Sequence, residues 1–206
     1  MEKANHKKKH NNKNLIFVLC GPSGVGKTSL KISILETNLD IRLCLSVTTR
    51  PETEASHNIK EYYYISDAEY ERLYKNGELI TRKRRQFGFY YGIKCSEIID
   101  ILEKGHHVIV ETTLWGINQL KKQFNNIISI FVAPPSLKEL KRRLKNRERE
   151  NDGEIALRFD LAKQILASFK RDMVDYCLIN EDLAASVDIV NAIITQEKLK
   201  LDSEHL

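Results

Sequence analysis

The chain has 206 residues, of which 42% are hydrophobic and 30% charged, and its formal net charge at pH 7 is +5. A chain of this size and composition can bury one sizeable core, which argues against a disordered or fibrous protein. Its apolar runs are too short to predict a membrane span. The cysteines form no C-x-x-C pair, and we expect reduced core thiols of a cytoplasmic protein at Cys20, Cys44, Cys95 and Cys177.

The basic excess lies at the N-terminus. Residues 1–14 hold five lysines and one glutamate, so the rest of the chain has a formal charge of only +1. The segment has no apolar stretch of the kind that a secretory signal requires. We expect a solvated, disordered basic tail, with a nucleic-acid or membrane contact as the weaker alternative.

A glycine-rich loop follows the first predicted strand, residues 15–20. It reads Gly-Pro-Ser-Gly-Val-Gly-Lys-Thr at residues 21–28, and a helix-compatible stretch follows at 29–36. The pattern G-x-x-x-x-G-K-[ST] between a strand and a helix is typical of loops that bind nucleotide phosphates. We expect Lys27 to contact phosphate and Thr28 to ligate Mg²⁺. The predicted contacts with ATP are Gly21, Ser23, Gly24, Val25, Gly26, Lys27, Thr28 and Ser29.

Strands and helices alternate along the remaining chain. Apolar runs at 43–47, 107–111, 127–133 and 177–180 predict strands buried on both faces. Ser136 and Glu139 form a capping box that opens a helix through Leu144, and residues 182–194 predict a final helix. This alternation predicts an α/β fold around a parallel sheet with right-handed crossovers.

Two stretches interrupt the alternation. Residues 48–92 are polar and aromatic, with short strands of a separate small sheet predicted at 61–65 and 87–92. Residues 146–158 are almost wholly charged before Ile155. We interpret each stretch as a lobe inserted into the core.

These motifs, in this order, resemble the guanylate kinases, a family of P-loop nucleoside monophosphate kinases. The resemblance spans most of residues 15–195 and is carried by residues 21–28, 46–51, 61–62, 90–92 and 134–137, and by Arg147, Arg158 and Asn180. It implies a three-layer P-loop core with a parallel sheet, an acceptor-binding lobe at about 46–96 and a lid at 146–158. On this basis the domain covers residues 15–198, and a C-terminal tail follows at 199–206.

The resemblance also implies an enzyme and its residues. The expected reaction moves the γ-phosphate of Mg-ATP to GMP, dGMP or a related small phosphorylated acceptor. Lys27, Arg147 and Arg158 would be catalytic, and Asn180 would join the ATP site. The implied acceptor contacts are Ser46, Arg50, Tyr62, Thr81, Tyr91, Glu111 and Thr113. A structural carboxylate that caps a nearby helix is the alternative for Glu111, and the oligomeric state stays open.

The acceptor site departs from the family pattern at four positions. Thr81 and Thr113 stand where the family has carboxylates, Thr53 stands for a phosphate-binding arginine, and Ile93 for a serine or threonine. A hydrogen bond to a charged group contributes roughly 1.5–3 kcal/mol. Losing two or three of these bonds predicts that transition-state binding with GMP is weaker by on the order of a hundredfold to ten-thousandfold, unless other contacts compensate.

Two alternatives follow from these departures. Residues 91–93, 105–110 and 149–151 are similar to ribose 1,5-bisphosphate phosphokinases, which would accept a different phosphorylated substrate. A guanylate-kinase-like module that binds a phosphorylated peptide without phosphoryl transfer is the second. The complete phosphate loop favours an enzyme over that module.

Overall fold

A computed structural model of the chain describes residues 13–52, 61–146 and 152–203. Its larger sheet is parallel throughout and has the strand order β2-β7-β1-β8-β9. The strands are β1 Ile16–Cys20, β2 Ile41–Leu43, β7 His107–Glu111, β8 Ile127–Ala133 and β9 Tyr176–Ile179. The predicted α/β fold with a parallel sheet is confirmed.

Helices cover both faces of this sheet because its central strand is apolar on both sides. All residues of β1 are buried, and they alternate between two core clusters: Phe17 packs in one, Ile16 and Val18 in the other. The cluster with Phe17 includes side chains from α1, α5, α6 and α7, and the opposite cluster includes side chains from α3 and α4. Their bounds are α1 Lys27–Thr37, α3 Cys95–Glu103, α4 Leu114–Gln123, α5 Leu137–Lys145, α6 Asp152–Ser168 and α7 Leu183–Ser203, and a short 3₁₀ turn spans Arg171–Met173.

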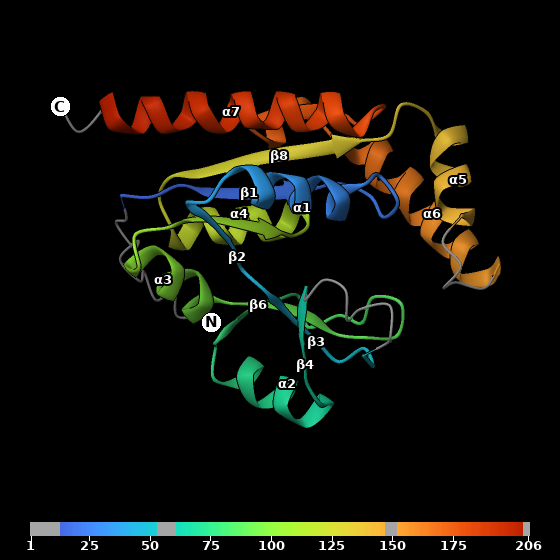
Figure 1. Cartoon of the computed structure of the whole chain (residues 1–206). Helices are drawn as coiled ribbons and strands as arrows, with labels where there is room; N and C mark the ends of the chain where they lie inside the picture. Colours follow the sequence, from blue (N-terminus) through green and yellow to red (C-terminus); the bar gives the residue numbers. More distant parts are fainter. Residues whose placement is uncertain (1–12, 53–60, 147–151, 204–206) are drawn as a thin grey trace.

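A second, smaller sheet forms a lobe beside the core, below it in Figure 1. Its strand order is β4-β3-β6-β5, and α2 packs with it. The elements are β3 Ser46–Thr48, β4 Tyr62–Tyr64, α2 Asp67–Lys75, β5 Leu79–Ile80 and β6 Tyr91–Lys94. The lobe therefore spans the stretch that interrupts the alternation of the sequence.

The strand predicted at 43–47 is two strands in two sheets. Cys44 N still donates to Ile109 O of the larger sheet at 2.9 Å, whereas Ser46 already pairs with Tyr62 and Ile93 in the smaller one. The residues of the junction are mostly apolar, and each of them is buried or half-buried, so the hydrophobic pattern carries no sign of the change.

Other boundaries also differ from the expectations. The strand predicted at 87–92 begins only at Tyr91, because Phe87 and Gly88 form a turn with φ angles of 52° and 85°. The last helix continues to Ser203, well past the expected Ile194, and Leu201 within it is 7% exposed and packs in the core. Residues 199–203 are therefore helix rather than tail. Cys177 is exposed rather than part of the core.

The helix start predicted at Ser136 is confirmed, since the Ser136 hydroxyl accepts a hydrogen bond from Glu139 N at 3.1 Å, whereas the Glu139 carboxylate accepts from Arg142 and Arg143. In the part predicted as a lid, residues 152–158 form the beginning of α6. Arg147, Thr53 and residues 1–12 of the basic tail lie outside the described residues.

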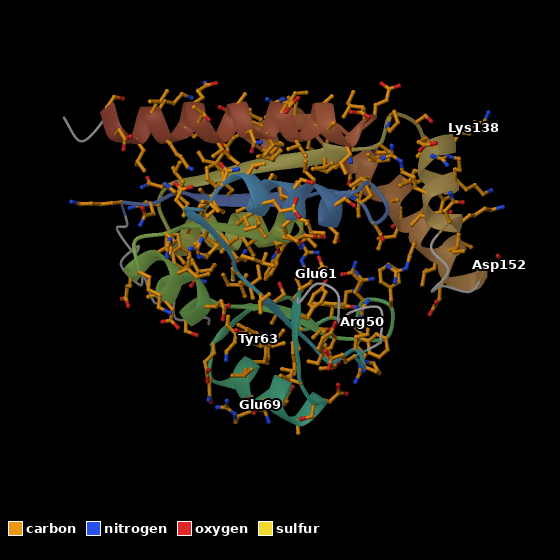
Figure 2. The ribbon with its side chains drawn as sticks, in the orientation of Figure 1. Arg50, Glu61, Tyr63, Glu69, Lys138 and Asp152 are labelled. Carbon is orange, nitrogen blue, oxygen red and sulfur yellow. The ribbon has the colours of Figure 1, made fainter. Side chains whose placement is uncertain are left out.

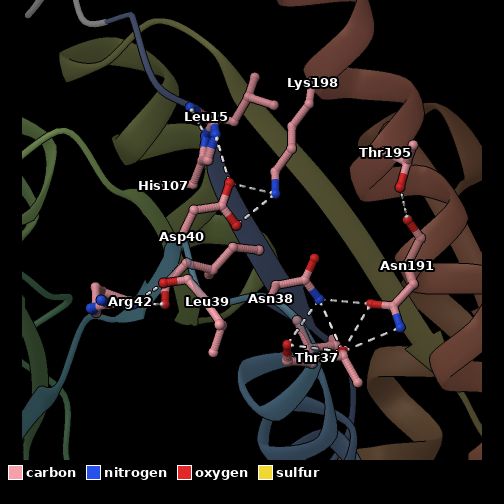
Figure 3. Close-up of polar contacts among 12 residues, drawn as sticks. Leu15, Thr37, Asn38, Leu39, Asp40, Arg42, His107, Asn191, Thr195 and Lys198 are labelled. Carbon is pink, nitrogen blue, oxygen red and sulfur yellow. Dashed lines mark hydrogen bonds and ion pairs between the residues drawn. The ribbon is translucent and has the colours of Figure 1, made fainter.

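Helix α7 is tied to the first strands by a polar cluster (Figure 3). Lys198 donates to both carboxylate oxygens of Asp40 at 2.9 and 2.8 Å, and His107 Nδ1 accepts from Leu15 N at 2.9 Å. Asn191 of α7 accepts from Asn38 Nδ2 at 2.8 Å.

Among the residues described, no helix is both long and apolar enough to cross a membrane.

Candidate active site

The phosphate loop joins the end of β1 to the start of α1, and its backbone requires glycine. Gly26 has a φ of 95° immediately before α1, and Gly21 has a φ of 135°. A Cβ atom at Gly21 would lie 2.2 Å from Val132 O, and one at Gly26 would lie 2.4 Å from Asn180 Nδ2. A loop with such backbone angles at the N-terminus of a helix can turn its N–H groups toward a bound anion.

Asn180 supports this loop from behind. It is 4% exposed, its Nδ2 donates to Val25 O at 2.7 Å, and its Oδ1 accepts from Ser186 Oγ at 2.9 Å. Arg143 of α5 donates to the Asn180 carbonyl at 2.9 Å and so fixes the same segment. The side-chain amide expected to contact ATP is thus engaged in holding the loop's shape.

Lys27, the loop lysine, opens α1 and lies against the loop. Its Nζ donates to Pro22 O at 2.7 Å and to Gly21 O at 3.0 Å, and it lies 3.4 Å from Glu111 Oε1. Thr28, in the first turn of α1, is half-buried, and Ser29 is exposed. Because β1 and β7 are parallel neighbours, the carboxylate that ends β7 lies beside the loop that follows β1.

A second lysine, whose role the sequence pattern does not reveal, joins Lys27 at Glu111. Lys31 is one turn further along α1, is 3% exposed, and places its Nζ 2.7 Å from Glu61 Oε1 and 3.5 Å from Glu111 Oε2. Burial alone would raise the pKa of Glu111, but the two lysines hold that pKa below its ordinary value. Glu111 is therefore an ionised carboxylate between two ammonium groups, and it caps none of the helices among the described residues.

The predicted acceptor residues Arg50, Tyr62 and Tyr91 lie together in the smaller lobe. The Arg50 guanidinium carbon is 5.6 Å from the centre of the Tyr62 ring, and the Tyr62 and Tyr91 rings meet edge to face at 5.9 Å. Arg50 Nε is buried and meets no hydrogen-bond acceptor in the part of the chain that the structure describes. Burial and the nearby carboxylates of Glu111 and Glu61 raise the pKa of Tyr62, so its hydroxyl remains a donor.

Figure 2 shows Arg50 and Glu61 on the side of the smaller lobe nearer the larger sheet, whereas Glu69 of α2 lies on the far side. Glu61 immediately precedes β4, and its partner Lys31 belongs to the core. This ion pair connects the core to the smaller lobe. Through Lys31, the contact between Lys27 and Glu111 is linked to Glu61 in one network of ion pairs.

The threonines at positions 81 and 113, where the resemblance led us to expect carboxylates, have structural partners of their own. Thr81 Oγ1 donates to Tyr91 O at 2.7 Å and lies 2.5 Å from the Tyr70 hydroxyl. Thr113 is the N-cap of α4 and accepts from Gly116 N at 3.2 Å. Ile93 is 3% exposed and packs in the core, and Ser46 is half-buried in β3.

Arg158 of the predicted lid lies at the phosphate loop. Its Nη1 donates to Ser23 Oγ at 3.4 Å, and its guanidinium carbon is 4.0 Å from the centre of the Phe87 ring. The site therefore gathers Lys27, Lys31 and Arg158 beside a loop that is suited to phosphate. Such an arrangement of cations can align and neutralise phosphoryl groups.

The chain resembles known proteins over most of its length. A family model described as guanylate kinase matches residues 13–197. A guanylate kinase of Rickettsia prowazekii is 33% identical over 197 residues, which are 96% of this chain and 98% of that protein. One from Clostridioides difficile is 35% identical over 189 residues, or 92% of this chain and 91% of that protein.

A solved structure, the guanylate kinase from Anaplasma phagocytophilum, superposes with a TM-score of 0.71 at 28% identity and covers 91% of this chain and 88% of its own. These matches confirm the resemblance predicted from the motifs, and they favour a nucleotide kinase over the ribose 1,5-bisphosphate and phosphopeptide-binding alternatives. The chain belongs to the guanylate kinase family and is an ATP-dependent nucleotide kinase.

Proposed function

We propose that this enzyme transfers the γ-phosphate of Mg-ATP to GMP or dGMP in the cytoplasm. The observation that carries the proposal is the contact of Lys27 with Glu111, 3.4 Å apart, where the phosphate loop after β1 lies beside the end of β7. A donor-site cation and an acceptor-site carboxylate in contact leave the two substrates side by side. An acceptor phosphate oxygen would then attack the γ-phosphorus in line as its bond to the β-phosphate oxygen breaks.

The proposed roles follow from the chemistry of each group. Lys27 leaves the loop carbonyls to hold the β- and γ-phosphates, and Arg158 neutralises the transferring phosphoryl group, a role that Arg147 would share. Arg50 supplies a buried guanidinium N–H to the acceptor phosphate, and the hydroxyls of Tyr62 and Tyr91 donate beside it. The loop residues Gly21, Ser23, Gly24, Val25, Gly26, Thr28 and Ser29 form the ATP site, which Asn180 supports.

The residues at the start of α1 suit a magnesium ion bound to ATP. Proteins usually hold such an ion through one or two side-chain oxygens, and phosphates and water supply the remaining ligands. The half-buried Thr28 hydroxyl, next to Lys27, is an oxygen of that kind. Mg²⁺ at Thr28 would offset the negative charge that the phosphates bring into the site.

An ADP-release assay tests the function. Wild-type protein is given Mg-ATP with GMP, dGMP, AMP, CMP, UMP or ribose 1,5-bisphosphate, and Lys27→Ala is the blank. We expect turnover with GMP or dGMP that Lys27→Ala abolishes without unfolding the protein. Turnover with another acceptor alone would refute the proposed substrate, and no turnover with any acceptor would refute the proposed reaction.

Position 113, where this chain has threonine in place of an expected carboxylate, permits a sharper test of acceptor choice. Thr113→Asp restores a carboxylate and still caps α4, because aspartate is among the best N-cap residues. Thr113→Asn is the matched control, since it caps equally well without the charge. A hydrogen bond to a charged group predicts a gain of about tenfold in kcat/KM for GMP with aspartate and little change with asparagine. Equal effects of the two variants would exclude position 113 from guanine recognition.

A further inference from the structure

We propose that Phe87 is a positioning residue for Arg158 and couples the smaller lobe to the ATP site. The Phe87 ring lies 4.0 Å from the guanidinium carbon of Arg158, and the same guanidinium donates to Ser23 Oγ at 3.4 Å. Three segments far apart in the sequence therefore meet at one arginine: the turn before β6, helix α6 and the phosphate loop. The inference rests on the proposed role of Arg158 in phosphoryl transfer.

The backbone at Phe87 is unusual for an aromatic residue. Phe87 and Gly88 are the central residues of a two-residue turn with φ angles of 52° and 85°, closed by Gln86 N to Phe89 O at 2.7 Å. Hairpin turns with two positive φ angles favour asparagine, aspartate or glycine at the first central position. A bulky side chain is strained there, so the turn itself gives no reason for phenylalanine. The reason lies in what its ring contacts.

The turn is firmly attached to the smaller lobe. Arg85 donates to Gly88 O at 2.6 Å, pairs with Asp67 at the start of α2 and covers the Tyr90 ring at 4.4 Å. Tyr90 in turn stacks on the buried ring of Tyr70, with 4.7 Å between ring centres. Phe87 therefore moves with the lobe that holds the proposed acceptor residues.

A ring that packs on a guanidinium does not occupy its N–H donors, because they point outward in the plane of the group. Phe87 thus fixes the orientation of Arg158 while the N–H edge reaches the phosphate loop and, on our proposal, the phosphates of ATP. Any movement of the smaller lobe on acceptor binding changes this support. Acceptor and ATP should therefore strengthen each other's binding, and that coupling must be reciprocal.

Phe87→Asn removes the ring and suits the turn better, so the protein should fold normally. Phe89→Leu is the matched control, since it removes a ring from the same turn while the ring on Arg158 stays. A cation–π contact between two half-buried side chains predicts a loss of roughly five- to thirtyfold in kcat when the ring is removed. We expect a loss of that size in kcat and a weaker effect of GMP on the affinity for ATP in Phe87→Asn, with little change in Phe89→Leu.

Arg158→Ala provides the decisive background. If Phe87 acts through Arg158, Phe87→Asn should cause no further loss of kcat or ATP affinity once Arg158 is alanine. An equal loss in both backgrounds, or wild-type behaviour of folded Phe87→Asn, would overturn the inference. Equilibrium binding of ATP to the four proteins gives this answer even if the wild type fails to phosphorylate GMP, so failure of the proposed function remains distinguishable.

Discussion

Replacing Lys31 with methionine probes the contact between the core and the smaller lobe. Lys31 is buried, and its ammonium lies 2.7 Å from Glu61 and 3.5 Å from Glu111, whose side chains are 22% and 31% exposed. Methionine keeps the packing of the stem but leaves two carboxylates without this cation. A hydrogen bond between charged groups contributes about 1.5–3 kcal/mol, and the partial exposure of the partners places the loss near the middle of that range, about 2 kcal/mol.

For a domain of this size, a loss of about 2 kcal/mol lowers the melting temperature by roughly 4–8 °C. Thermal unfolding of Lys31→Met should show this decrease. Lys75→Met is the control, because Lys75 is 71% exposed and its ion pair with Glu71, at 3.7 Å, should contribute less than about 1 kcal/mol. Adding Glu61→Gln to Lys31→Met should recover part of the loss, since the amide removes one carboxylate without a partner.

The same variant should weaken acceptor binding more than ATP binding, because Glu111 loses one of the two cations that hold its carboxylate. Steady-state kinetics with each substrate varied in turn measure the two effects. The reasoning is refuted if Lys31→Met melts within about 2 °C of the wild type, as Lys75→Met should, and keeps its KM for the acceptor.

Three further predictions concern stability and the phosphate loop. Burial, followed by the nearby Lys198, lowers the pKa of His107 below its ordinary 6.5, so stability should fall as the pH drops below about 6.5, and thermal unfolding of His107→Asn should depend less on pH. Leu201→Ala should cost about 2 kcal/mol and several degrees in melting temperature, whereas the 64% exposed Leu199→Ala should change little. Gly26→Ala should lose ATP binding in equilibrium titrations, because its Cβ would lie 2.4 Å from Asn180 Nδ2.

The sequence predicts the parts of this fold that rest on local patterns. The phosphate loop is recognisable because its glycines allow backbone angles that other residues rarely adopt. The helix start at Ser136 is recognisable because the capping serine and Glu139 are three residues apart. The strands at 107–111 and 127–133 appear with their predicted bounds, since they are buried on both faces. The junction between β2 and β3, after Leu43, could not be predicted in this way, because an apolar residue can pack in either sheet.

Residues whose role depends on distant partners could not be predicted in the same way. Lys31 lies on a helix rich in polar residues, and only the return of the chain at Glu61 and at the end of β7 supplies its two carboxylates. The sequence predicts that Arg50, Tyr62 and Tyr91 converge only through the family resemblance, since their spacing alone carries no such information. Phe87 would pass for a core aromatic residue until its φ angle and its contact with Arg158 are known.

Three of the four expected departures in the acceptor site, Thr81, Thr113 and Ile93, lie among the residues that the structure describes, and none of them has a carboxylate to offer a ligand. The hydroxyls of Thr81 and Thr113 are engaged in hydrogen bonds within the protein, and Ile93 packs in the core. The remaining carboxylates, Glu61 and Glu111, are each already matched by a lysine. A carboxylate in an ion pair keeps lone pairs for further hydrogen bonds, so the lysines can hold Glu61 and Glu111 in place while a guanine base donates to them. The phosphates of ATP compete with Glu111 for Lys27, because all of these partners are anions. Binding of ATP should therefore loosen the Lys27–Glu111 pair and leave Lys31 to hold Glu111 for the acceptor, which makes the order of substrate addition, measured by kinetics with both substrates varied, a direct readout of this ion network.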